Sequence, residues 1–138
     1  MVKQDKKSIV IKTVLSWGLT LGLAGAAVAN ASSWTVSNVT VSDHGRWSSY
    51  GESNLKVTNS NVASFNGDSQ PAVLGYKVHL INSHAATRSD TVGLYVNQTT
   101  YAGNNSGKKN YYYYADVRSQ SIEPSTTRVK LHFSSDRK

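Results

Sequence analysis

The residues best suited to proton transfer or metal binding are the histidines, because the chain contains no cysteine. They are His44, His79, His84 and His132. A hydrolytic triad needs a serine held against a histidine and a carboxylate behind it, and no Gly-x-Ser-x-Gly motif frames any serine here. The sequence therefore predicts no catalytic residue, and a small secreted hydrolase stays a lower-ranked alternative.

Metal and cofactor chemistry also lack a motif. His79 and His84 are not part of a His-Glu-x-x-His pattern. Asp43 and His44 are neighbours whose side chains would diverge on a strand, although a turn before Gly45 could bring them together. The stretch 103–109, GNNSGKK, has three residues between its glycines, where a phosphate-binding P-loop has four. We expect a hairpin loop with two exposed lysines there, no metal site and no cofactor.

Rings and cations alternate along two stretches of the C-terminal half. In the tyrosine run 111–114, strand alternation leaves Tyr112 and Tyr114 outward beside Arg118. If the strand around 127–133 pairs with this one as a hairpin across Glu123-Pro124, the outward rows form one ligand-binding face with Lys108 and Lys109 at its rim. Its residues are Tyr112, Tyr114, Arg118, Arg128, Lys130 and His132. The alternative is a solvated sheet face on which the tyrosines only stabilise strand pairing.

A second cluster of polar and aromatic residues spans 43–51 and contains two glycines. We expect Trp47 and Tyr50 to be half-buried packing residues. Arg46 is the residue of this cluster that we predict to contact a ligand.

The elements that must position these side chains are strands. Apolar residues recur with period two in 127–133, 72–80, 92–96 (continuing toward Tyr101) and 111–117, and more weakly in 55–57 and 34–36. A change of phase near Asn38 predicts a β-bulge or bend. Turn formers at 66–68, 82–84, 103–107 and 123–125 separate them. The pattern predicts an all-β fold, a single antiparallel β-sandwich or small barrel of about six or seven strands over residues 32–138.

Residues 1–31 have the three parts of a secretory signal peptide: lysines near the start, an uncharged apolar tract over 13–29, and the small-residue site Ala29-Asn30-Ala31. The alternative is a retained membrane anchor, for which the tract is short and only weakly apolar. No cysteine follows it, so we expect a freely secreted product rather than a lipid-anchored one. The absence of cysteine in an exported protein fits a Gram-positive route.

The net charge of +7 first indicates a nucleic-acid partner. The leader, however, holds four of the 15 basic residues and one of the eight acidic ones, which leaves 11 against seven and a net charge of +4. An exported protein does not meet intracellular nucleic acid. The expected partner is instead an anionic cell-wall polymer, a membrane surface or an extracellular protein, with self-association through exposed strand edges as a further expectation.

In size, leader and charge the chain resembles small secreted proteins of Gram-positive bacteria, including cysteine-free bacteriocins of the lactococcin type. The resemblance is one of class rather than of motif, so it transfers no site residue. It implies a secreted antibacterial protein as the alternative to a non-enzymatic binding protein, although the mature part lacks the amphipathic helix of membrane-active peptides.

Overall fold

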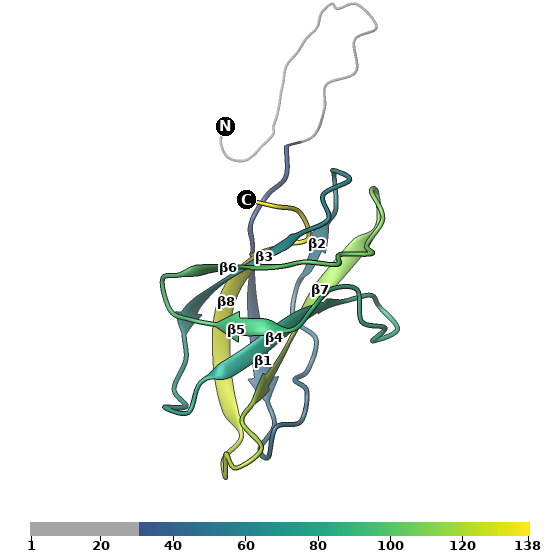
Figure 1. Cartoon of the computed structure of the whole chain (residues 1–138). Helices are drawn as coiled ribbons and strands as arrows, with labels where there is room; N and C mark the ends of the chain where they lie inside the picture. Colours follow the sequence, from purple (N-terminus) through teal and green to yellow (C-terminus); the bar gives the residue numbers. More distant parts are fainter. Residues whose placement is uncertain (1–30) are drawn as a thin grey trace, which may run out of the picture. The chain divides into compact units, whose positions relative to one another are not determined.

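A computed structural model describes residues 31–138, so the predicted signal peptide lies outside the described residues except for Ala31. The described part contains strands and no helix (Figure 1). Its eight strands are β1 (Thr35–Val41), β2 (Ser53–Leu55), β3 (Ala63–Ser69), β4 (Tyr76–Ile81), β5 (Val92–Leu94), β6 (Thr99–Ala102), β7 (Tyr112–Ser119) and β8 (Thr127–Ser134). The all-β prediction is confirmed for these residues.

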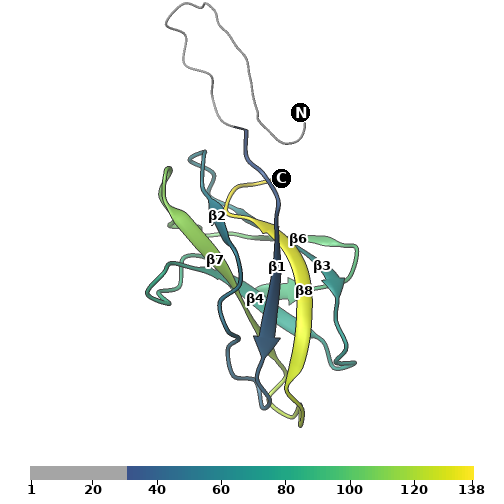
Figure 2. The same ribbon diagram turned by 180° about the vertical axis from the view of Figure 1, so that it is seen from behind.

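The strands form two antiparallel sheets of four strands each, which lie face to face (Figures 1 and 2). One has the order β1-β8-β3-β6 and the other the order β2-β7-β4-β5. We call them the β8 sheet and the β7 sheet. Strands that are consecutive in the chain mostly belong to different sheets, so most connections cross from one layer to the other.

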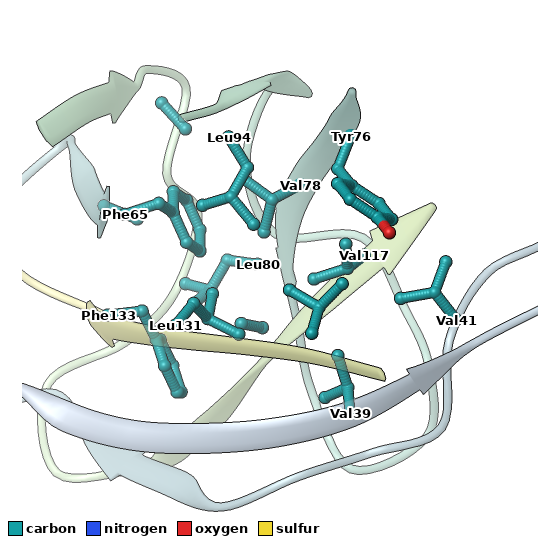
Figure 3. Packing of buried hydrophobic residues seen from close by; sticks show 14 of the residues in the cluster. Val39, Val41, Phe65, Tyr76, Val78, Leu80, Leu94, Val117, Leu131 and Phe133 are labelled. Atoms are coloured by element: carbon teal, nitrogen blue, oxygen red, sulfur yellow. The ribbon is translucent and has the colours of Figure 1, made fainter. Parts of the chain in front are cut away.

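The core lies between the two sheets and is built from the inward residues of each strand (Figure 3). Val129, Leu131 and Phe133 of β8 point inward as predicted, and the Phe133 ring stacks on Phe65 with centroids 6.2 Å apart. From β7 and β4 the inward set is Tyr113, Ala115, Val117, Tyr76, Val78 and Leu80. Both sheets thus present one apolar face and leave the other face to solvent, which is the usual pattern of a sandwich.

The central strand β3 was not among the predicted strands, because Asn66, Gly67 and Asp68 have the composition of a turn. The structure shows why these residue types stand in a strand. The Asn66 amide donates to the Thr99 hydroxyl at 2.9 Å across the β3–β6 pair. A Cβ on Gly67 would lie 2.8 Å from the Tyr95 carbonyl oxygen, so this glycine allows a close backbone approach.

Two further details of the predicted strands are wrong. β1 runs in continuous register with β8 from Thr35↔Phe133 to Val41↔Thr127, so the bulge near Asn38 is absent and the irregularity lies in β3 instead, between Gly67 and Ser69. The stretch 92–101 is not one strand: β5 belongs to the β7 sheet and β6 to the β8 sheet. This split and the unpredicted strand β3 account for eight strands where six or seven were expected.

A buried ion pair fixes the end of the chain to the strand β2, and we call it the C-terminal clamp. Lys56 and Asp136 have fully buried side chains, with Lys56 Nζ 3.3 Å from Asp136 Oδ1. Lys56 Nζ also donates to the carbonyl oxygens of Ser60 (2.8 Å) and Ser135 (2.9 Å). The Asp136 carboxylate accepts the backbone N–H groups of Val57 and Thr58 and the Thr58 hydroxyl. Every donor of the ammonium group therefore has an acceptor.

The clamp shifts the pKa values of both groups. Burial raises the pKa of the Asp136 carboxyl, but the hydrogen bonds from Thr58 and Val57 and the charge of Lys56 outweigh it, so the pKa lies below the usual value. Burial also lowers the pKa of Lys56, against the attraction of Asp136. The carboxylate is thus held as an anion, whereas for the ammonium the cost of burial outweighs the attraction of Asp136.

Candidate ligand-binding face

The residues predicted to form one binding face lie on opposite faces of the sandwich. β7 and β8 do not pair as a hairpin, because the segment through Glu123-Pro124 crosses from the β7 sheet to the β8 sheet. Tyr112, Tyr114 and Arg118 are on the outer face of the β7 sheet. The remaining members of the predicted face, Arg128, Lys130 and His132, are on the outer face of the β8 sheet.

On the β8 sheet, two of the three residues are engaged within the fold. His132 Nδ1 lies 2.8 Å from Asp68 Oδ1, and the Trp34 ring meets His132 edge-on with centroids 4.7 Å apart. Arg128 donates to the Thr40 hydroxyl at 2.8 Å. This face therefore carries cations, but its rings are few and the histidine is paired.

Arg46 lies apart from both sets, in the loop between β1 and β2. It pairs with Asp43 three residues earlier, and the hydrogen bond from Arg46 holds the pKa of Asp43 below its usual value. The contacts of its guanidinium group are thus with Asp43, within the same loop.

Exposed rings gather on the outer face of the β7 sheet, and we call the set Trp47, Tyr50, Tyr112 and Tyr114 the aromatic ridge. Residues 47–55 run beside β7: Trp47 bridges to Arg118 and β2 pairs with Tyr112–Tyr114. Ser48 secures the segment, since its N–H donates to the Val117 carbonyl at 2.7 Å and its hydroxyl accepts the Val117 N–H at 3.0 Å. Tyr50 then reaches Tyr114, with ring centroids 5.1 Å apart.

At one end of the ridge, Trp47 lies flat on His79, with centroids 3.9 Å apart and an interplanar angle of 3°. The Arg118 guanidinium is 5.2 Å from the centroid of the same indole. Lys77 stands opposite Arg118 in the β4–β7 register, so two cations flank this end. Sequence alternation found Tyr112, Tyr114 and Arg118, whereas Trp47 and Tyr50 were read as packing residues.

A serine, a histidine and an aspartate meet beneath Trp47, but in an order that does not activate the serine. The Ser48 hydroxyl is 3.1 Å from Asp116 Oδ1, and His79 Nε2 is 3.4 Å from Asp116 Oδ2. The carboxylate thus lies between the hydroxyl and the imidazole, whereas nucleophilic catalysis needs the imidazole against the hydroxyl. The trio buries Asp116 and fixes the stacked histidine.

The other end of the ridge opens into a groove of about 670 Å³ between the loop 82–88 and the loop 103–111. Both loops lie near the start of β7 (Figure 1). The lining residues are Asn82, Ser83, His84, Arg88, Ser106, Lys108, Tyr111, Tyr112 and Tyr113. The sequence predicted Lys108 at the rim of a binding face and His84 in a turn, whereas nothing in it pointed to Arg88 or Tyr111. Arg88 and Lys108 come to line the same groove only through the fold.

Within residues 31–138, no cluster of three or more histidine, aspartate or glutamate residues is placed to hold a metal ion. The same part of the chain has no helix whose length and apolar character would suit a membrane span. Comparisons with protein-family models, with curated proteins and with solved structures found no match.

Proposed function

We propose that the protein is a secreted, non-enzymatic β-sandwich that binds an extracellular polymer of the cell envelope through the aromatic ridge. The observation that carries the proposal is the gathering of exposed rings on one sheet face. Trp47 is 37% exposed, Tyr50 43% and Tyr112 59%, and the half-buried Tyr114 packs against Tyr50. Clustered exposed rings are rare on surfaces that face only water, and they favour a contact surface.

The shape of the ridge favours an elongated ligand. Tyr112 and Arg118 are six residues apart on β7, which places them about 20 Å apart along an extended strand. The rings follow this direction, with cations near either end. Flat rings stack on the carbon faces of sugars, and the cations beside them attract anionic groups. A chain of sugar units can use several rings at once, which adds affinity without a deep pocket.

The arrangement of polar groups supports binding rather than catalysis. Ser48, which shares the Asp116 carboxylate with His79, uses its hydroxyl to hold Asp116 and the Val117 N–H. The leader-like residues 1–31 support export, and the net charge of +4 expected after cleavage supplies a modest attraction to anionic polymers.

The chain offers a matched pair of tryptophans for the test. Trp47 on the ridge and Trp34 beside the opposite sheet are both 37% exposed. We expect Trp47→Ala and Tyr112→Ala each to reduce binding to purified cell walls by about 5- to 100-fold, since one stacked ring contributes about 1–3 kcal/mol. Trp34→Ala should bind like the unmodified protein.

The measurement is a pull-down on purified cell walls, with fluorescence titration of solubilised wall polymer, at several salt concentrations. Binding should weaken clearly toward about 0.15 M salt, where the Debye length is about 8 Å. Equal losses for Trp34→Ala and Trp47→Ala, or no retention of the unmodified protein, would refute the proposal. Thermal unfolding of each variant checks that the fold is kept.

A further inference from the structure

We infer that the groove between the loops 82–88 and 103–111 is a subsite for an anionic group, and that the ligand of the ridge is therefore a polymer carrying phosphate or carboxylate groups. The inference deepens the proposed function and rests on it for the polymer.

The groove is cationic. Arg88 and Lys108 line it together with His84, and no acidic residue is among its lining residues. Within the described chain, the side-chain hydrogen bond of Arg88 goes to the neighbouring Thr87 carbonyl at 3.2 Å, and no ion pair there involves Arg88 or Lys108. Asp90, the acidic residue nearest to Arg88 in the sequence, accepts hydrogen bonds from the Asn104 side-chain amide at 3.0 and 3.2 Å. The two cations thus keep donors for an incoming anion.

The loop 82–88 forms the first wall of the groove, and one asparagine side chain holds its shape. The Asn82 side chain accepts the N–H groups of His84 and Ala86, both at 2.9 Å, and the Asn82 N–H donates to the Ala86 carbonyl. This closed turn holds Ala85 at a φ of 63°, a left-handed conformation that costs about 1–2 kcal/mol for a residue with a Cβ. Such strain persists only where the surroundings impose it, and it concentrates at functional sites.

The loop 103–111 forms the second wall, and hydrogen bonds connect it to the first wall and to buried residues. The Ser106 N–H donates to the Arg88 carbonyl at 2.7 Å, which joins the two loops directly. The buried Asn105 amide donates to the Ser135 carbonyl at 2.8 Å, and the Lys108 N–H donates to the Tyr113 hydroxyl at 2.6 Å. The cations therefore stand on fixed backbone, so binding an anion orders little additional chain.

The groove and the ridge share a residue. Tyr112 lines the groove and is also the first ring of the ridge, and Tyr111 beside it is 62% exposed. A polymer unit whose sugar or polyol carbons lie on Tyr112 would place its charged group toward Arg88 and Lys108. The groove volume of about 670 Å³ falls in the usual range of small-ligand sites, about 300–1,000 Å³.

The test separates the anion site from the polymer. In an NMR titration of the protein with inorganic phosphate and, separately, with acetate, we expect shifts of the amides of residues 83–88 and 106–108. Lys108→Gln and Arg88→Gln should each weaken these responses by about 5- to 30-fold, whereas Lys109→Gln, a neighbouring exposed lysine that does not line the groove, should change them less than twofold. No shift at the groove, or equal effects of Lys108→Gln and Lys109→Gln, would overturn the inference.

A second arm uses three polymers: poly(glycerol phosphate), polygalacturonate and neutral dextran. A preference for the phosphate or the carboxylate polymer identifies the anionic group, and the preference should disappear in Lys108→Gln while residual ridge binding remains. Equal binding of dextran and both anionic polymers would overturn the inference and leave the proposed function standing. Groove shifts with phosphate but no binding to cell walls or any polymer would leave the anion site standing and refute the proposed function.

Discussion

Asp136→Asn tests whether the C-terminal clamp stabilises the fold through charge. The substitution keeps the size of the side chain but replaces one acceptor oxygen with an NH₂ group. The altered side chain then faces the Lys56 ammonium, the backbone N–H groups of Val57 and Thr58, and the Thr58 hydroxyl. At least one of these donors loses its acceptor, and the buried ammonium loses its countercharge.

The expected cost follows from that burial. Breaking a buried ion pair from one side costs about 3–5 kcal/mol, because the remaining charge stays out of water without compensation. A domain of this size has a free energy of unfolding of about 5–15 kcal/mol. With a urea m-value of about 1–3 kcal/mol/M, the midpoint of unfolding should fall by at least about 1 M.

The assay is urea unfolding followed by tryptophan fluorescence, on the unmodified protein and on three variants: Asp136→Asn, Lys56→Met and the double variant. We expect the double variant to be at least about 2 kcal/mol more stable than the sum of the single effects predicts, since it removes both buried charges together. Additive single effects, or a loss below about 1 kcal/mol for Asp136→Asn, would refute the electrostatic account of the clamp.

Two further outcomes follow from the same structure. The pKa of Asp136 is lower in the folded protein than in the unfolded chain, so the unfolded chain is protonated first as the pH falls. The stability that the Asp136 carboxylate contributes is therefore present above its ordinary pKa of 3.8 and is lost as the pH falls below it. Urea midpoints between pH 5 and pH 2 should consequently fall less in Asp136→Asn than in the unmodified protein. Gly67→Ala should lower the free energy of unfolding by about 1–3 kcal/mol, because its Cβ would lie 2.8 Å from the Tyr95 carbonyl oxygen. Gly103→Ala, whose Cβ would lie 3.6 Å from Asp90, is the control and should cost clearly less in the same assay. Matching pH slopes, or equal losses for the two alanines, would contradict these expectations.

Local alternation predicted the strands whose inward residues are uniformly apolar, and it did so because burial on one face imposes period two. β8 shows this best, with Val129, Leu131 and Phe133 inward. β3 was not predicted because its inward positions include Gly67, which makes room for a neighbouring backbone rather than filling the core. Single-residue preferences cannot register such a tertiary requirement.

The candidate site was predictable only in part, because alternation shows which residues face outward but not which sheet a strand joins. Both layers of a sandwich present the same kind of apolar inner face, so Tyr114 and Lys130 could be assigned to one outer face equally well. The groove could not be predicted from the sequence for a similar reason. Arg88 and Lys108 are far apart in sequence, and the Ser106–Arg88 backbone hydrogen bond brings their loops together.

β8 is the last strand of the described chain, yet it lies between β1 and β3 in its sheet. Without β8, β1 has no partner in that sheet, and Asp136, which follows β8 and completes the C-terminal clamp, is missing too. β3 would then pair with β6 alone, so the β8 sheet would be reduced to two strands. The order of the strands thus makes the completion of this sheet and of the clamp depend on the same segment, residues 127–136.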